Sequence, residues 1–112
     1  MIFVFGPYAA GKRETVKRLF DMNEEIFAAR CVCDVQDLAA EREDVEALAE
    51  ELSRYNVVIA TETGGGIVPV EENARRARER AGTLNRLLAE KADTVIRVFY
   101  GIPVALKGKL PC

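Results

Sequence analysis

The chain has 112 residues, of which 49% are apolar and 30% are charged, and its formal net charge is −2. This size and balance suit one globular domain spanning residues 1–112, and the small net charge gives no field that would draw the protein to nucleic acid or to an anionic membrane. No apolar run approaches the roughly 20 residues of a transmembrane helix, and Met1–Phe5 lacks the basic flank of a signal peptide, so a cytoplasmic location is expected.

Short apolar runs alternate along the chain with longer stretches of helical periodicity. The apolar runs predict buried strands over Ile2–Phe5, Ala28–Val35, Val57–Thr61 and Thr94–Tyr100. The periodic stretches predict helices: Lys12–Asp21, Glu41–Arg54 and Glu71–Lys91. A glycine-rich loop is expected over Thr63–Pro69, and Gly101–Cys112 is expected to be a tail. This order predicts a three-layer α/β domain with a mostly parallel sheet of about four to five strands.

The segment Gly-Pro-Tyr-Ala-Ala-Gly-Lys, residues 6–12, follows the first strand and matches G-x-x-x-x-G-K. In this motif backbone N–H groups and a helix N-terminus surround a phosphate, and the lysine reaches the β/γ oxygens. The pattern therefore predicts a P-loop NTPase-like domain that binds ATP or GTP, with Lys12 acting in catalysis. The alternative is an ordinary Gly-Pro turn with a solvated lysine. The predicted nucleotide-binding residues are Gly6, Pro7, Tyr8, Ala9, Ala10, Gly11, Lys12, Arg13 and Glu14.

Arg13 occupies the position at which this motif normally has a Ser or Thr that binds Mg²⁺. Because a guanidinium has no lone pair to offer a cation, either Thr15 or water fills that position, or Mg²⁺ binds weakly, or the loop holds phosphate without turnover. Asp34, at the end of the second predicted strand, is the candidate Mg²⁺ ligand. Its alternative role is that of an ordinary turn residue.

A second distinctive segment runs from Val57 to Pro69 and reads VVIATETGGGIVP. It resembles the N-E-V-G-x-G-I-V-P segment of the adenosylcobinamide kinase/adenosylcobinamide-phosphate guanylyltransferase family. The similarity continues over nearly the whole C-terminal half, through Glu72-Asn73-Ala74-Arg75, Leu84-Asn85, Ala92-Asp93, Gly101-Ile102-Pro103 and Leu106-Lys107.

This resemblance implies a kinase-type site with ATP or GTP at the loop and Mg²⁺ near Asp34. It implies that the side-chain hydroxyl of a corrinoid, adenosylcobinamide, accepts the phosphoryl group. Glu62 would be the second catalytic residue, orienting that hydroxyl or a metal-bound water, or else it caps its own glycine loop. The family's ring-like assembly implies a homo-oligomer, with a trimer as one form.

The chain differs from the family in the segment between the first helix and Asp34. There the family carries the histidine that takes up GMP, whereas this sequence contains no histidine. The resemblance therefore implies a kinase-like phosphotransferase without histidine-dependent guanylyl transfer. The alternative is a catalytically weak nucleotide-binding protein with a regulatory or scaffolding role. The three cysteines, of which Cys31 and Cys33 are separated by one residue, are expected to be small buried apolar residues rather than metal ligands.

Overall fold

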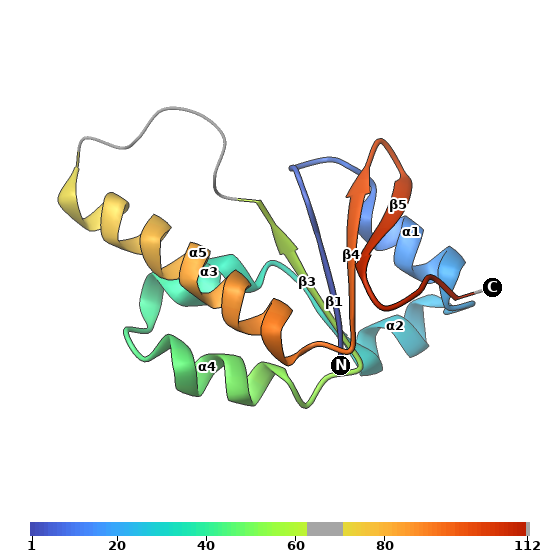
Figure 1. Ribbon diagram of the computed structural model, residues 1–112, viewed down its shortest axis with the longest axis horizontal. Helices are drawn as coiled ribbons and strands as arrows, with labels where there is room; N and C mark the ends of the chain where they lie inside the picture. The colour runs from blue at the N-terminus through green and yellow to red at the C-terminus, as the bar shows by residue number, and fades with distance from the viewer. Residues whose placement is uncertain (63–70, 112) are drawn as a thin grey trace.

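The structure, a computed structural model, describes residues 1–62 and 71–111. The predicted glycine loop over 63–69 and the last cysteine, Cys112, lie outside these residues. The described elements alternate between strands and helices for most of the chain (Figure 1). In order they are β1 (Ile2–Gly6), α1 (Lys12–Leu19), α2 (Glu24–Arg30), β2 (Cys31–Val32), α3 (Val35–Glu41), α4 (Val45–Leu52), β3 (Val57–Thr61), α5 (Glu72–Lys91), β4 (Thr94–Phe99) and β5 (Ile102–Lys107).

The five strands form one sheet in the order β2-β3-β1-β4-β5. The first four are parallel, and β5 runs antiparallel to β4, so the predicted mostly parallel sheet is confirmed. Gly6, the last residue of β1, pairs with Thr61, the last residue of β3. The segments that follow these two strands therefore start side by side at the carboxyl edge of the sheet, where ligands bind in folds of this type.

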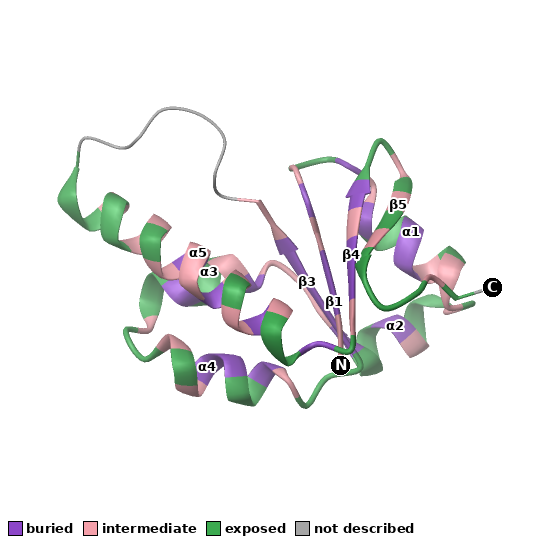
Figure 2. Cartoon of the chain, in the orientation of Figure 1, coloured by how far each residue is buried: buried purple, intermediate pink, exposed green. Residues whose placement is uncertain are grey.

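Helices cover both faces of the sheet, which gives the predicted three layers (Figure 1). On one face, Val4, Ile59 and Ile96 pack with Val16 of α1 and with Phe27 of α2. The opposite face packs against α3, α4 and α5, and most residues of β1 and β3 are buried (Figure 2). Burial of each such side chain stabilises the fold by about 1.5–3 kcal/mol. None of the helices within the described residues is both long and apolar enough to cross a membrane.

The prediction of a strand over Ala28–Val35 is wrong for most of its length. Residues 24–30 form α2, and only Cys31 and Val32 are in a strand. The helix begins where the Asn23 side chain accepts a hydrogen bond from the backbone N–H of Ile26, at 2.8 Å. Asn followed by two glutamates is a helix-start signal, and the first residues of the apolar run that suggested a strand, Ala28 and Ala29, belong to the last turn of this helix.

In place of the single helix predicted over Glu41–Arg54, the structure has a shorter helix, α4, and another helix, α3, comes before it. The first of the two, α3, ends at Glu41, and α4 begins only at Val45. The break occurs because the Asp44 carboxylate accepts a hydrogen bond from the N–H of Ala47 at 3.0 Å and so caps α4.

The predicted tail after Gly101 contains an edge strand, β5, that forms a hairpin with β4. Phe99 and Ile102 are paired across a two-residue turn, in which Tyr100 and Gly101 both have positive φ angles, 53° and 71°. Positive φ at both central residues matches the right-handed twist of a hairpin. Pro103 suggested a tail, but it is tolerated in an edge strand because only one side of such a strand is paired.

Candidate functional site

The predicted phosphate loop lies between β1 and α1, and each of its two glycines has a specific structural reason. A Cβ atom at Gly6 would lie 2.2 Å from the carbonyl oxygen of Val98, so the close approach of β1 to β4 leaves no room for a side chain. Gly11 precedes α1 with a φ angle of 82°, a left-handed conformation that other residues rarely adopt. At the start of α1 the first amide groups have no intrahelical acceptor, and they carry the positive end of the helix dipole.

Lys12 folds back over the loop instead of extending into solvent. Only 8% of the residue is exposed. Its Nζ donates to the carbonyl oxygens of Gly6 at 3.2 Å and Pro7 at 2.8 Å, and to Oγ1 of Thr61 at 3.1 Å. Burial lowers the pKa of Lys12, and the nearby carboxylates of Asp34 and Glu62 partly oppose this effect. A cation that is poorly hydrated beneath a loop of N–H donors is suited to binding phosphate oxygens.

A pocket of about 280 Å³ opens above this lysine, and we call it the phosphate pocket. Seven of the nine predicted nucleotide-binding residues line it, while Gly6 and Pro7 contribute the carbonyls that hold Lys12. The lining residues are Tyr8, Ala9, Ala10, Gly11, Lys12, Arg13, Glu14, Asp34, Ile59 and Thr61. Thr61 was not predicted as a site residue, although its position at the end of a strand beside the loop was a usable signal.

Arg13 and Asp34 face each other across the phosphate pocket. The guanidinium Nη2 lies 2.9 Å from Oδ2 of Asp34, and both side chains are about half exposed. Asp34 has a φ angle of 57° and precedes α3, which turns its side chain toward the start of α1. The carboxylate predicted to bind Mg²⁺ is thus paired with the arginine that replaces the expected Ser or Thr.

Thr15, the other candidate for the hydroxyl that Arg13 lacks, contacts the hairpin turn after β4. Its side chain is buried, and its Oγ1 donates to the carbonyl oxygen of Gly101 at 3.5 Å. The hairpin turn at Gly101 also supports the loop, because the N–H of Gly101 donates to the carbonyl of Ala10 at 2.8 Å. Arg18 bonds to the same turn, with its Nη2 3.1 Å from the Gly101 carbonyl. This support is a long-range contact that the loop motif does not reveal.

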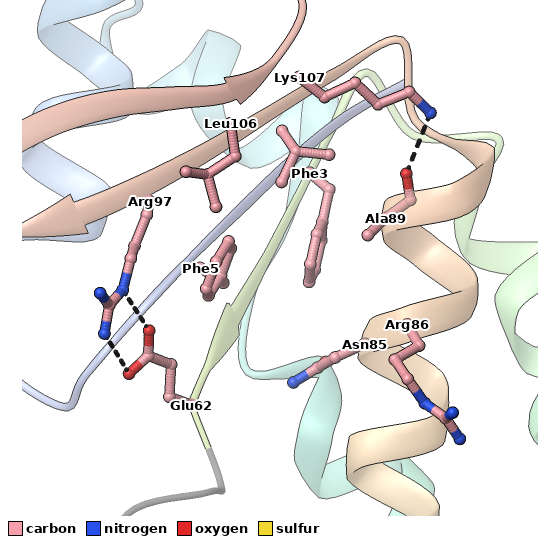
Figure 3. A pocket seen from close by; sticks show the side chains of 10 residues that line it. Phe3, Phe5, Glu62, Asn85, Arg86, Ala89, Arg97, Leu106 and Lys107 are labelled. Atoms are coloured by element: carbon pink, nitrogen blue, oxygen red, sulfur yellow. Dashed lines mark hydrogen bonds and ion pairs between the residues drawn. The ribbon is translucent and has the colours of Figure 1, made fainter.

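Glu62 lies beside the loop but on the other face of the sheet. Its backbone N–H donates to the Gly6 carbonyl at 2.9 Å, while its carboxylate receives two bonds from Arg97, at 2.6 and 3.2 Å (Figure 3). Successive residues of a strand point to opposite faces, so Thr61 lines the phosphate pocket and Glu62 lines a different hollow. The pairing with Arg97 was not predicted from the sequence.

That hollow is an open cavity of about 710 Å³ between α5 and the strands β1, β4 and β5, and we call it the α5 cavity. Its walls are mainly apolar and include Phe3, Phe5 and Leu106. Asn85 of α5 projects into it, and the Glu62–Arg97 pair lies at one end (Figure 3).

The cysteines that the structure describes have the environment of structural residues. Cys31 is buried, and burial raises the pKa of its thiol to about 11. Burial also raises the pKa of Cys33, so neither thiol is activated at neutral pH. Over residues 1–62 and 71–111 no three His, Cys, Asp or Glu side chains are grouped so that they could hold a metal ion.

Comparisons with known proteins agree with the family resemblance. The sequence model of a family described as "Cobinamide kinase / cobinamide phosphate guanyltransferase" matches residues 14–106. The chain is 37% identical over 76 residues to the bifunctional adenosylcobalamin biosynthesis protein CobP of Pseudomonas aeruginosa, covering 68% of the chain and 44% of the relative. It is 36% identical over 72 residues to the bifunctional adenosylcobalamin biosynthesis protein CobU of Escherichia coli, covering 64% and 40%.

A shikimate kinase from Chromohalobacter salexigens is also similar, at 33% identity over 110 residues, covering 86% of the chain and 59% of the relative. The chain thus spans between 40% and 59% of the length of these three relatives.

Proposed function

Because the chain belongs to the cobinamide kinase / cobinamide phosphate guanyltransferase family, we propose that it is a nucleotide-binding P-loop protein of cobalamin metabolism. In this proposal it transfers a phosphoryl group from ATP or GTP to the side-chain hydroxyl of adenosylcobinamide. The position of Lys12 supports the proposal most strongly: a poorly exposed ammonium is bonded to loop carbonyls under a pocket lined by helix-start residues. A solvated lysine after an ordinary turn would have none of these contacts.

The residues around the phosphate pocket have distinct roles in this proposal. The loop backbone from Tyr8 to Arg13 would hold the phosphates through N–H groups. Lys12 would exchange its carbonyl partners for phosphate oxygens, since a charge-assisted bond to an anion is stronger than one to a neutral carbonyl. Arg13 would leave Asp34 and add a second cation, and its planar fork can bind two phosphate oxygens together.

The pocket is poorly suited to a firmly bound Mg²⁺. Among the lining residues that the structure describes, only Glu14 and Asp34 carry carboxylates, and Asp34 is paired with Arg13. Mg²⁺ prefers octahedral oxygen coordination, and a guanidinium supplies no oxygen. We therefore propose that Mg²⁺ arrives with the nucleotide and that Asp34 contacts it only weakly.

Guanylyl transfer through histidine has no basis in this sequence, which contains no histidine. After incubation with GTP labelled at the α-phosphate, we expect no protein-bound label that is stable to alkali and labile to acid. Such an adduct would mean that a lysine or another nucleophile replaces the histidine.

Two alternatives to the cobinamide kinase activity have specific support. Arg13, in place of the usual Ser or Thr, favours a catalytically weak protein that binds nucleotide for regulation or scaffolding. The similarity to a shikimate kinase over 86% of the chain favours a smaller alcohol as phosphoryl acceptor. Incubation with ATP labelled at the γ-phosphate, together with adenosylcobinamide or with shikimate, separates the three. Label in the corrinoid supports the proposal, label in shikimate supports the second alternative, and label in neither supports the binding protein.

The variant Lys12→Ala tests the nucleotide site itself. Losing a charge-assisted contact should weaken ATP binding by about 1.5–3 kcal/mol, roughly 10- to 150-fold. Lys17→Ala is a matched control, since Lys17 is also on α1 but pairs with Glu24 and does not line the pocket. Equal affinity of ATP for the two variants would contradict the proposed site.

We also propose that the protein works in the cytoplasm as a homo-oligomer, with the trimer as the form that the family resemblance implies. The support is the edge strand β5, whose Ile102, Val104 and Leu106 are all exposed, because exposed apolar strands at a sheet edge favour association. Sedimentation velocity tests this, and a monomer at all concentrations would contradict it.

A further inference from the structure

We propose that the α5 cavity is the binding site for the phosphoryl acceptor, and that it takes a molecule with a largely apolar body and a carboxamide or hydroxyl group at its edge. This inference rests on the proposed function for the identity of its probe, but its support comes from a different part of the molecule. The cavity volume, about 710 Å³, is within the usual range of roughly 300–1,000 Å³ for small-molecule sites.

The cavity walls favour an apolar ligand body. Phe3 and Phe5 stack with ring centroids 5.7 Å apart, and with Leu106 and Ala89 they form its sides (Figure 3). Lys107 joins β5 to the end of α5, because its Nζ donates to the carbonyls of Ala89 at 3.2 Å and Glu90 at 3.1 Å. The apolar surface is therefore held open between β5 and the end of α5.

Asn85 gives the cavity an unsatisfied hydrogen-bonding group. Its side chain projects from α5 toward the cavity (Figure 3). Its Oδ1 is shielded from solvent and has no hydrogen-bond partner among the residues that the structure describes. Buried polar atoms without partners are rare in proteins and require an explanation. In Figure 3 the amide nitrogen of Asn85 points toward the cavity. A ligand carboxamide or hydroxyl would supply the missing partner of Oδ1 once the amide rotates and turns its oxygen into the cavity.

The charged residues that line the cavity differ in how far they are already engaged. Glu62 and Arg97 pair with each other, and Lys107 is bonded to the carbonyls at the end of α5. Arg86 is exposed at the rim and bonds to Oγ1 of Thr83 at 3.4 Å, so it can reach a polar group at the edge of a bound ligand. Cobinamide, a corrinoid whose ring carries carboxamide side chains, fits the requirement for an apolar body with amide groups at its edge.

The α5 cavity and the phosphate pocket meet at the carboxyl edge of the sheet. Thr61 bonds to Lys12 in the pocket, and the next residue, Glu62, lines the cavity and bonds to Gly6 through its backbone. A ligand ring in the cavity and a hydroxyl carried on a flexible side chain could thus occupy neighbouring positions.

Two cavity variants and one control test the inference, with dicyanocobinamide as the probe in an absorbance titration. Ala89→Phe fills the cavity and should weaken binding at least about tenfold. Asn85→Leu removes the amide and should weaken binding about fivefold, while the melting temperature rises because an unsatisfied polar group is lost. Ala29→Phe on α2 is the control, since Ala29 is exposed and does not line the cavity, and it should bind as the unmodified protein does.

Fluorescent N-methylanthraniloyl-ATP, titrated with the same four proteins, separates this inference from the proposed function. We expect its affinity to be the same in all four. Cobinamide binding that depends on Ala89 and Asn85, without any ATP binding, would support the cavity and overturn the proposed function. No cobinamide binding, or equal binding in all variants, would overturn the cavity inference. If the Ala89→Phe variant dissociates an oligomer without changing the affinity for cobinamide, that result would also overturn the cavity inference. It would show that the α5 cavity lies at a contact between copies of the chain.

Discussion

The phosphate pocket and the α5 cavity lie on opposite faces of one sheet and are built in different ways. The pocket is formed mainly by consecutive residues of a loop and a helix start, with Lys12 bonded to the loop's own carbonyls. The cavity is formed by side chains from β1, α5, β4 and β5, which are far apart in the sequence. A local motif specifies most of the first kind of site. The second kind exists only because the fold brings those elements together.

Gly6 belongs to the framework of both sites, and Gly6→Ala should have the largest effect on the protein because it disturbs both at once. The new Cβ would lie 2.2 Å from the Val98 carbonyl, so β1 and β4 must separate, at a cost of about 3 kcal/mol in the free energy of unfolding. Gly82→Ala on α5 is the control. A Cβ there meets no atom within 4 Å, and the better helix propensity of Ala should stabilise the protein by about 1 kcal/mol. Urea unfolding measures both changes in free energy. Equal stabilities of the Gly6→Ala and Gly82→Ala variants would contradict this prediction and would show that β4 can move away from β1 at little cost.

Glu62 links the two sites, and replacing it should affect turnover more than binding. If its carboxylate orients the acceptor hydroxyl, Glu62→Gln should lower kcat about 100-fold and leave ATP affinity unchanged. Arg97→Gln keeps the carboxylate and removes only its partner, so a smaller decrease is expected. Glu50→Gln, at an exposed pair with Lys91, should have no effect. Equal losses in Glu62→Gln and Arg97→Gln would indicate that the ion pair only holds the structure in place.

Arg13 determines how much the phosphate pocket depends on metal. With its guanidinium available as a second cation, the unmodified protein should bind ATP nearly as well in chelator as in Mg²⁺. Arg13→Ser should lose about tenfold in metal-free affinity and recover it when Mg²⁺ is added. Titrations of ATP and GTP with each protein, with Mg²⁺ and with chelator, measure this. A strong Mg²⁺ requirement in the unmodified protein would mean that Thr15, Asp34 or Glu62 holds the metal after all.

The lowered pKa of Lys12 predicts opposite pH trends for binding and for stability. As the pH rises, Lys12 in the free protein loses its proton below the ordinary value of 10.5, so nucleotide affinity should fall by at most about tenfold per pH unit. Over the same range the unfolded chain binds more protons than the folded one, so this residue's contribution to stability should rise with pH. Lys12→Arg stays charged and should remove both trends. An affinity of the unmodified protein that stays constant up to pH 10.5 would contradict the burial argument.

The fold and the phosphate pocket could largely be predicted from the sequence. Buried strands such as Val57–Thr61 read as continuous apolar runs, and Gly11 satisfies a local backbone requirement of the loop. The prediction was wrong at Ala28–Val35 because the apolar run there was given more weight than the helix cap at Asn23. It also missed β5, because Pro103 suggested a tail where the left-handed Tyr100–Gly101 pair makes a hairpin turn.

The α5 cavity could not be predicted in the same way, because its defining contacts are long-range. Nothing in the sequence near Glu62 indicates that Arg97, on another strand, holds its carboxylate. Asn85 stands out in the sequence only as part of the family resemblance, and its unpaired amide is a property of the packed structure. The Arg13–Asp34 pair is an intermediate case, since each residue was singled out but their contact was not.

Calorimetric titration of the unmodified protein with ATP, in Mg²⁺ and in chelator, tests the central claim most directly. We predict saturable binding at one site per chain under both conditions, because the loop amides, Lys12 and Arg13 together provide the positive charge and the donors that phosphate requires. No binding of ATP or GTP under either condition would contradict the account, because it would leave Lys12 and the two loop glycines with a purely structural role.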